Sequence, residues 1–588
     1  MALIDKASLL MVPSTYEAGT LYNVLPSGNR APDSTDQNSG YDQTRADFDF
    51  DRGSNASATR IGSDGLIKKY RENVVLHSNS FDNAAWTKTN SSVTSGQTGY
   101  DESSNAWKID ISSAFAQVEQ VVSNSGVQTF SVYAKAGTLN WVRLRVDHTT
   151  FSGTYFDLQN GAVGSTASDI NSTIEDLGGG WYRCSISVNY ALTRVRIYPA
   201  IANNDLTATT GSIYIQNAQL ESGLVATDYL ESTSVTGKAG VLVDLPRINY
   251  DANGENGALL LEPSRQNFVT QSEYFGAWTL NGGGTGSNPV LDFGHTSPEG
   301  VDNAYKVTFD TGAGTTTSDE SIMYISKSGL TAGNDYTASV YLKGAVGGEE
   351  VIVRDTEGSY TKWTLTTEWK RYEMTQAAAG SSYATSFGVR QGLGGIGTIN
   401  SNAIVYMYAF QSEAGNYVSS YIPTMGTSET RAADRAQILN TTTDVLSQTT
   451  FTLFFEADLT SDTTNNYRDI VAFRSSVSSN SLRLETRTDN SVRVQQSGMI
   501  TSGDNWNSSA IGDTDNKKFA MTFTTSQVRF YADGSLVSTY NGAYSNDLNH
   551  ILFSNSTSLG VETKTNFKQY ILFSEALTDA ECITLTTL

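Results

Sequence analysis

The chain has 588 residues and a formal net charge of −22, and since a single hydrophobic core rarely grows beyond about 300 residues, this length predicts several domains. The acidic balance argues against a nucleic-acid partner, because binding to a phosphate backbone needs clustered Lys and Arg. Charged residues make up only 17% of the chain, whereas Gly, Tyr and Phe number 51, 30 and 23, which is typical of strands joined by tight turns.

Cysteine, histidine and long apolar runs are all scarce. Cys184 and Cys582 are the only cysteines and fall in different segments, so we expect no disulfide framework. The four histidines form no ligand-like pair, which argues against zinc chemistry. No apolar run approaches the roughly 18 residues of a membrane helix, and the opening MALIDKASLL lacks the features of a secretory signal. We expect synthesis in a cytoplasm and no membrane insertion.

Residues 1–58 form an irregular leader. Most of it is rich in turn residues, but ADFDFDRG alternates strictly, with Asp47, Asp49 and Asp51 on one face and Phe48 and Phe50 on the other. We expect an extended segment that lies along a surface. Two interpretations remain open, a small structural lead-in and an arm that docks on a partner or drives oligomerisation.

Two long stretches of the chain repeat each other in order, and this duplication predicts two equivalent modules at 59–245 and 246–437. The repeated segments are NAWKIDI and NAYKVTF, SVYAKAG and SVYLKGA, GWYRCSISV and EWKRYEMTQ, and IYIQNAQLESG and VYMYAFQSEAG. The spacing between them varies, as expected for duplicated strands whose loops have drifted. Each copy is introduced by a predicted two-residue hairpin turn, at Asp64-Gly65 and at Asn253-Gly254.

Within each copy, alternating segments such as NWVRLRVD and RVRIYPAIA predict about eight strands with apolar side chains inward. Each copy should therefore be a jelly roll of two antiparallel sheets. Residues 438–588 contain a different strand series, with a hairpin turn at Asp533-Gly534. Near the end, Thr578 and Glu581 form a capping box that predicts a short helix, with Ala580 and Ile583 as its apolar side.

The last block resembles a LamG or concanavalin-A-like lectin domain, through MTFTTSQVRFYADGSLV, SLG at 558–560 and FKQYILFSEALTDAE. Upstream, ATRIGSDGLI, NSFDNAAWTK, FSVYAKAG, GGGWYRCSISV, AQLESG and YIPTMGTSETRAAD resemble carbohydrate-binding-module-like jelly rolls of bacteriophage tail fibres, head fibres and other virion surface proteins. The resemblance implies an all-β protein of two jelly rolls and a lectin-like sandwich, with homotrimeric assembly and binding to host-surface glycans. It also implies a location on the virion surface after synthesis in the host cytoplasm.

Tryptophans are the natural candidates for stacking on sugar rings, because an indole offers flat apolar area and a polar edge. Trp86 and Trp278, like Trp181 and Trp369, occupy matching places in the two copies, which favours shared core packing. The remaining candidates are Trp506, which we expect in a polar loop of the lectin-like block, and Trp141 and Trp363, which lack an obvious counterpart in the other copy.

Two oxygen-rich segments raise the question of calcium. Asp462, Asn465, Asn466 and Asp469 form such a segment in the lectin-like block, and a Ca²⁺ site there stays open beside simple solvation. Asp251, Asn253, Glu255 and Glu262 have EF-hand-like spacing, but Asn256 replaces the required Gly, so we expect a plain hairpin turn. No other cofactor is expected.

A catalytic role is not favoured. Glu456 and Asp458 alternate along FFEADL as in retaining glycosidases of the lectin-like fold, but the third acid of the ExDxxE pattern is missing. We expect no enzyme, and a virion fibre or surface protein that adheres to host glycans, with the leader contacting other virion proteins. A purely structural capsid-decorating or tail-assembly protein is the alternative, and a polysaccharide depolymerase is the third.

Overall fold

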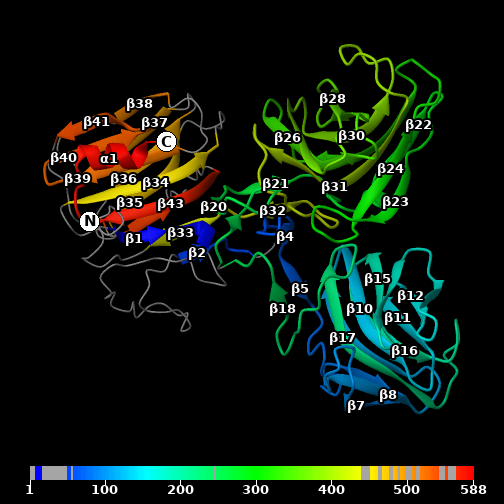
Figure 1. Cartoon of the computed structure of the whole chain (residues 1–588). Helices are drawn as coiled ribbons and strands as arrows, with labels where there is room; N and C mark the ends of the chain where they lie inside the picture. Colours follow the sequence, from blue (N-terminus) through cyan, green and yellow to red (C-terminus); the bar gives the residue numbers. More distant parts are fainter. Residues whose placement is uncertain are drawn as a thin grey trace.

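The computed structural model describes residues 7–15, 49–54, 57–243, 245–438, 450–460, 467–475, 481–487, 491–497, 506–510, 517–541, 548, 550–553 and 564–587. Within these residues the chain forms three antiparallel β-sandwiches and one short α-helix (Figure 1). The all-β architecture expected from the sequence is confirmed. In this part of the chain no helix is long and apolar enough to cross a membrane.

The first sandwich is a jelly roll of two six-stranded sheets. The sheet orders are β14-β15-β10-β17-β8-β7 and β13-β12-β11-β16-β9-β6. The chain crosses between the sheets so that the central strands run β15-β10-β17-β8 and β12-β11-β16-β9, which is the double Greek key of a jelly roll. The strands are β6 (Thr87–Thr89), β7 (Ser91–Gln97), β8 (Ala106–Ile111), β9 (Gln117–Asn124), β10 (Val127–Ala136), β11 (Trp141–Asp147), β12 (Phe151–Asp157), β13 (Ala162–Thr166), β14 (Asn171–Gly178), β15 (Trp181–Asn189), β16 (Leu192–Ala200) and β17 (Gly211–Ser222).

The second sandwich repeats the same topology with two five-stranded sheets. Their orders are β23-β24-β31-β26-β29 and β22-β25-β30-β27-β28, so eight central strands correspond one to one with those of the first jelly roll. The strands are β22 (Thr279–Gly283), β23 (Val290–His295), β24 (Ala304–Asp310), β25 (Glu320–Ser328), β26 (Asp335–Gly344), β27 (Glu350–Arg354), β28 (Thr361–Thr364), β29 (Lys370–Ala377), β30 (Ser382–Arg390) and β31 (Asn402–Ala414), with a 3₁₀ turn η3 (Phe275–Ala277) before them.

The tryptophans shared by the two copies lie in the cores. Trp86 and Trp278 are almost fully buried. Each indole donates one hydrogen bond to a backbone carbonyl at the matching place, Trp86 to His77 at 3.0 Å and Trp278 to Gln271 at 2.9 Å. The prediction that the duplicated tryptophans pack in the core is confirmed for this pair.

A short two-stranded ribbon closes each jelly roll. In the first copy β5 (Arg71–Asn73) pairs with β18 (Gly237–Ala239), and in the second β21 (Arg265–Asn267) pairs with β32 (Glu429–Arg431). The amide of Asn73 donates to the carbonyls of Ala218 and Leu230, and that of Asn267 donates to Phe410 and Ile422. The duplicated unit therefore includes the chain that leaves the last strand.

The first lead-in hairpin packs on the second jelly roll, not on the first. It consists of β3 (Thr59–Ile61) and β4 (Ile67–Lys69), joined by a five-residue loop in which only Gly65, with φ 73°, is left-handed. A two-residue turn was expected there, and that expectation is wrong. The buried side chain of Ile67 packs with Ala304, Tyr408, Ala409 and Tyr421, and its N–H donates to Pro298 at 3.0 Å.

The second lead-in hairpin likewise joins the following domain. Its strands β19 (Ile248–Asn249) and β20 (Ala258–Leu261) extend a sheet of the C-terminal sandwich, where β20 pairs with β43 (Thr565–Phe573). Each module that begins with a hairpin thus gives that hairpin to the next domain along the chain.

The C-terminal sandwich consists of an eight-stranded and a seven-stranded sheet. The orders are β19-β20-β43-β34-β39-β40-β41, with β1 also paired to β43, and β2-β33-β42-β35-β36-β37-β38. Phenylalanines fill much of the core between them. The remaining strands are β33 (Arg435–Ile438), β34 (Phe451–Leu459), β35 (Tyr467–Arg474), β36 (Ser481–Arg487), β37 (Ser491–Ser497), β38 (Trp506–Ala510), β39 (Lys517–Phe523), β40 (Gln527–Ala532), β41 (Ser535–Asn541) and β42 (His550–Phe553).

The described parts of the leader are strands of this same sandwich. β1 (Ala7–Met11), followed by the 3₁₀ turn η2 (Pro13–Thr15), pairs with β43, and β2 (Asp49–Asp51) pairs with β33. Met11 is fully buried in the core. The expected separate arm is therefore not what these two segments form, and residues 16–48 lie outside the described residues. Both ends of the chain lie in one lobe (Figure 1).

Two local predictions for the C-terminal block are confirmed. Asp533 and Gly534 both have positive φ, 47° and 71°, in a two-residue turn between the paired residues Ala532 and Ser535. The helix α1 (Asp579–Thr586) begins with the expected capping box: the Glu581 N–H donates to the Thr578 hydroxyl and the Thr578 N–H donates to the Glu581 carboxylate. Its buried side consists of Cys582 and Thr586, so the expected apolar side of Ala580 and Ile583 is wrong.

Candidate functional site

The outer face of one sheet of the first jelly roll combines aromatic and arginine side chains. Along β11 the buried residues Val142, Leu144 and Val146 alternate with four outward residues, because successive side chains of a strand point to opposite faces. The outward residues are Trp141, Arg143, Arg145 and Asp147. One strand therefore presents an indole, two guanidinium groups and a carboxylate in a row.

Strand register places further aromatic residues on both sides of this row. Arg143 lies opposite Tyr155 of β12 and Tyr198 of β16. Its guanidinium carbon is 5.1 Å from the centroid of the Tyr155 ring and 5.9 Å from that of Tyr198. At such distances a guanidinium is attracted by the ring faces, so the arginine is held flat between two tyrosines.

Phe151 extends the aromatic row toward solvent. Its side chain is 53% exposed, which is unusual for a phenylalanine. The guanidinium carbon of Arg145 lies 3.9 Å from the ring centroid, and its Nε donates to Asp147 at 2.8 Å. Phe151 thus has one face on an arginine and the rest open to solvent.

Arg196 ties the polar side of the face together. It donates to Asp147, to Gln117 at 3.0 Å and to the Tyr198 hydroxyl at 3.2 Å, and it lies 3.1 Å from Glu119. Burial alone would lower the pKa of Arg196, but the Tyr198 hydroxyl and the two carboxylates outweigh burial and raise it. The guanidinium stays charged and fixed.

Trp141 forms the edge of the face. Its partly buried indole packs against the cluster of Tyr155, Tyr198, Ala200 and Leu206. The ring also crosses Gly164 of β13, where a Cβ would lie only 2.6 Å from Cζ3 of the indole. The absence of a side chain at position 164 therefore gives the ring its place.

The second jelly roll does not repeat this face. Val142 pairs with Phe156 in the first copy as Val351 pairs with Trp363 in the second, which aligns β11 with β27. By that register Trp141 corresponds to Glu350 and Arg143 to Ile352, whereas Arg145 corresponds to Arg354. Glu350 is paired with Lys362 at 2.8 Å and Arg354 lies over the Tyr360 ring at 4.5 Å. The same scaffold thus carries different outer surfaces.

The register also gives Trp363 the counterpart that the sequence did not show. The residue is only 8% exposed and belongs to the core of the second jelly roll, as its equivalent Phe156 does in the first. With no open ring face it is not a ligand candidate. Trp506 begins strand β38 and pairs with Val494 of β37, so its backbone is in a strand and not in the expected loop, while its side chain lies outside the described residues.

Of the four calcium candidates, only Asp469 can be placed. It is a buried residue of β35 and lies 3.7 Å from Arg483 of β36. Asp462, Asn465 and Asn466 lie outside the described residues, and the prediction of a Ca²⁺ site stays open. Within the described ranges no three His, Cys, Asp or Glu residues form a group suited to a metal ion.

The EF-hand-like spacing belongs to a hairpin turn. The Asp251 carboxylate accepts hydrogen bonds from the N–H groups of Asn253 and Glu255, both at 2.9 Å, and from the Asn256 amide at 2.8 Å. Glu262 lies elsewhere, in an ion pair with Arg247. Of the two alternating acids of FFEADL, Asp458 lies 2.8 Å from Lys568.

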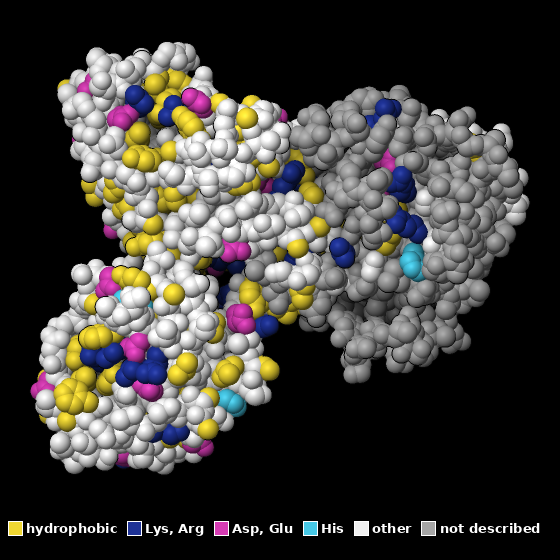
Figure 2. All heavy atoms as spheres, turned by 180° about the vertical axis from the view of Figure 1, so that it is seen from behind, with side chains coloured by type: hydrophobic (Ala, Val, Ile, Leu, Met, Phe, Trp, Pro, Cys, Tyr) yellow, Lys and Arg dark blue, Asp and Glu magenta, His cyan; other side chains and the backbone are white. Residues whose placement is uncertain are grey.

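Figure 2 shows hydrophobic, basic and acidic side chains gathered on the lobe of the first jelly roll, at the lower left, and a second mixed cluster on the lobe above it. Sequence reasoning identified only Trp141 on the first of these faces. The period of two along NWVRLRVD carried the signal for its three neighbours. Tyr155 and Tyr198 join them only through the register of separate strands.

Comparison with known proteins shows fold likeness alone. Neither a protein-family model nor a curated protein matches the chain. The carbohydrate-binding module CBM40 of Ruminococcus gnavus IT-sialidase is similar at 12% identity and TM-score 0.21, over 24% of this chain and 84% of its own. The receptor binding domain of botulinum neurotoxin D is similar at 12% identity and 0.21, over 26% and 41%. A SAP-like pentraxin from Limulus polyphemus gives 11% and 0.20, over 24% and 70%. Likeness at this level carries no argument about function.

Proposed function

We propose that the chain is a non-enzymatic adhesion protein of a bacteriophage virion surface and that it binds host-surface glycan through the outer face of its first jelly roll. One observation carries the binding proposal: the row of Trp141, Arg143, Arg145 and Asp147, flanked by Tyr155, Tyr198 and Phe151, is absent from the matching strand of the second copy. The sequence resemblance to tail-fibre and head-fibre jelly rolls supports the virion assignment.

The chemistry of this face suits a sugar. Trp141 and Phe151 offer apolar ring area for the C–H face of a pyranose, and Arg145, Arg196 and Asp147 offer donors and an acceptor for its hydroxyls. Fixed guanidinium groups lose little side-chain entropy on binding. A single open face of this kind binds weakly, and we propose that several copies, as a homotrimer, supply avidity.

Glycan arrays and titrations with the full chain test the proposal. Trp141→Ala and Phe151→Ala should each weaken glycan binding roughly tenfold or more, as expected for aromatic anchors. Glu350→Ala, at the position of the second copy that corresponds to Trp141, is the matched control and should leave binding unchanged. Wild-type binding that survives both aromatic substitutions would place the glycan site elsewhere.

A structural role is the second candidate, because the hairpins that link each module to the next domain favour a stiff connector. In that case virions without the protein should be fragile or misassembled, but should adsorb to cells normally. Loss of adsorption by intact particles that carry Trp141→Ala would decide for adhesion.

A further inference from the structure

A polar cavity of about 140 Å³ lies where the three sandwiches meet. Four segments supply its walls: the first hairpin through Arg60, the second hairpin through Glu262, the second jelly roll through Arg371 and the C-terminal sandwich through Lys564. Its volume is several times the roughly 30 Å³ that one water occupies in the liquid. The cavity exists only when all these parts are assembled.

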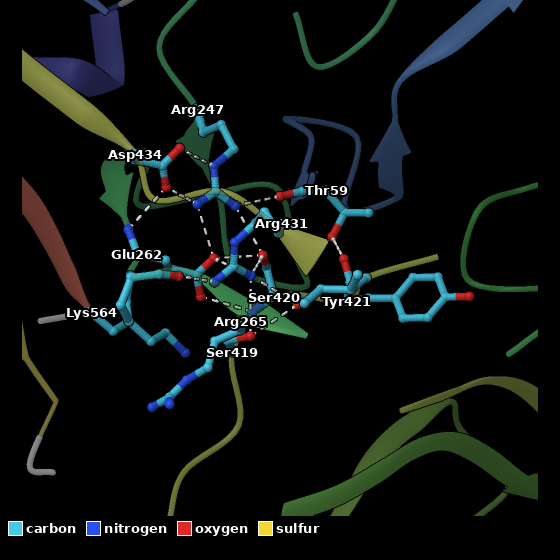
Figure 3. A network of polar contacts seen from close by, with 12 residues as sticks. Thr59, Arg247, Glu262, Arg265, Ser419, Ser420, Tyr421, Arg431, Asp434 and Lys564 are labelled. Carbon is cyan, nitrogen blue, oxygen red and sulfur yellow. Dashed lines mark hydrogen bonds and ion pairs between the residues drawn. The ribbon is translucent and has the colours of Figure 1, made fainter. Parts of the chain in front are cut away.

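Beside the cavity, a network of buried ion pairs uses up the nearby carboxylates (Figure 3). Glu262 has a fully buried side chain that lies 2.9 Å from Arg247 and 3.1 Å from Arg431, and it also accepts from the Ser420 N–H and hydroxyl. Asp434 pairs with Arg247 and with Arg52. Each of these two carboxylates therefore already answers two arginines.

The cations that face the cavity have neutral oxygens as hydrogen-bond acceptors. The Lys564 ammonium donates to the Val418 carbonyl at 3.0 Å. Arg371 donates to the Ser419 carbonyl at 2.7 Å and to the Ser339 hydroxyl at 2.9 Å. Arg60 donates to the Ile248 carbonyl at 3.0 Å. These bonds orient the cations but do not neutralise their charge.

The balance of charge at this junction is the reverse of that of the chain. Among the described residues of the network and the cavity wall, three carboxylates, Glu262, Glu413 and Asp434, face seven cations: Arg52, Arg60, Arg247, Arg265, Arg371, Arg431 and Lys564. The whole chain has a net charge of −22. Several like charges held together away from water are costly unless an opposite charge joins them.

We propose that this cavity binds one compact oxyanion, held by Lys564, Arg371 and Arg60. The chemistry fits a phosphate or sulfate ion and equally the carboxylate of an acidic sugar that reaches into the opening, because each presents oxygens to charge-assisted N–H donors. The bound anion joins residues of all three sandwiches and so holds their arrangement. The site is independent of the glycan face on the first jelly roll.

Calorimetric titration of the full chain in chloride buffer with sodium phosphate, sodium sulfate and sodium glucuronate, at matched ionic strength, tests the proposal. We expect one anion per chain for wild type and a loss of roughly tenfold or more in affinity for Lys564→Met, because a hydrogen bond to a charged group is removed. Lys568→Met, on the same strand but paired with Asp458 outside the cavity wall, is the matched control and should bind as wild type.

The outcomes separate the sources and the alternatives. Phosphate or sulfate binding that Lys564→Met loses assigns an inorganic ion, and saturable binding of glucuronate alone assigns a sugar carboxylate. Should Lys564→Met fold poorly by circular dichroism, Arg60→Met, on a different segment, must weaken binding instead. Trp141→Ala should leave the anion titration unchanged even if it abolishes glycan binding. No saturable anion binding by wild type, or equal binding by both cavity variants, overturns the proposal.

Discussion

Single residues of this chain act through the room that their neighbours leave. The indole of Trp141 lies across Gly164, where any Cβ would lie 2.6 Å from the ring. The two tyrosines around Arg143 come from different strands. The glycan face therefore depends on glycine and register as much as on the residues that would touch a sugar.

Gly164→Ala should displace the indole without a large loss of stability, because a contact below 3.0 Å forces the neighbouring ring to move. We expect a changed tryptophan fluorescence spectrum and weaker glycan binding in the full chain. Gly380→Ala is the control, since a Cβ there meets nothing within 4 Å. An unchanged spectrum together with unchanged affinity would show that the ring is not held as described.

The buried Glu262 gives the junction a defined response to acid. Burial by itself would raise the pKa of this carboxyl, but Arg431 and Arg247 outweigh burial and hold the pKa well below its ordinary value of 4.5. A carboxyl with a lowered folded-state pKa stabilises the fold above its unfolded pKa, and that stabilisation is lost as the pH falls below it.

Glu262→Gln should therefore flatten the loss of stability between about pH 5 and pH 3, while it lowers stability at pH 7 by about 3–5 kcal/mol because two buried arginines lose a partner. Calorimetric unfolding over a pH series measures both effects. Glu255→Gln, in the exposed turn of the same hairpin, should follow the wild-type curve. Parallel curves for wild type and Glu262→Gln would contradict the assignment.

Among the elements, the lead-in hairpins show how duplicated parts acquired different neighbours. β3 and β4 pack on the second jelly roll above Tyr341 and Tyr408. At the matching place of the first jelly roll, Tyr100 stacks on Tyr133 with ring centroids 4.7 Å apart. Tyr100 occupies the sequence position of Pro298, so the first copy covers with its own side chain what the second copy leaves to a hairpin.

Lys69 fixes that hairpin through charge. Its ammonium lies 2.9 Å from Glu273 and 2.7 Å from Glu299, both buried. Burial raises the pKa of Glu273, whereas at Glu299 the ammonium outweighs burial and lowers the pKa. The two carboxylates share one cation and depend on it.

Lys69→Met should cost about 3–5 kcal/mol, because it leaves buried carboxylates without their cation. Lys68→Met is a close control: its side chain pairs with the exposed Asp64, and the loss should stay below about 0.5 kcal/mol. Unfolding midpoints of the two variants give the comparison, and similar midpoints would show that the hairpin is held by Ile67 and not by charge.

The predictions from sequence succeeded where a signal is local. A period of two and two matching copies were enough for eight strands per jelly roll, and a capping box was enough for the start of α1. They failed where distant segments meet. Nothing within Ala7–Met11 indicates that its partner is β43, because many alternating segments offer equivalent edges.

The same limit applies to the candidate site. Alternation along one strand identifies the face that Trp141 shares with Arg143, but the flanking Tyr155 and Tyr198 depend on pairings that the sequence does not contain. For the cavity, Arg60 and Lys564 are hundreds of positions apart and meet only because each hairpin joins the next domain.

At the scale of the whole molecule, the N-terminal strand completes the C-terminal sandwich. Removal of residues 1–15 would leave half of one edge of β43 without a partner and expose the core around Met11. We expect the unfolding midpoint of this sandwich to fall by about 5 °C or more. A synthetic peptide of residues 1–15 should restore it when added in trans, and a truncated chain as stable as wild type would contradict the pairing.

The entry of β1 and the exit of β43 into one sheet also determine how the molecule would carry a pull. If tension were applied between residues 7 and 573, it would pass directly through the β1–β43 pairing in the C-terminal sandwich, while both jelly rolls, inserted between these strands in sequence, would hang as unloaded side arms. A receptor held by the first jelly roll would instead load the hairpins and the junction cavity. The duplicated modules are therefore branches and not the shaft of a rod.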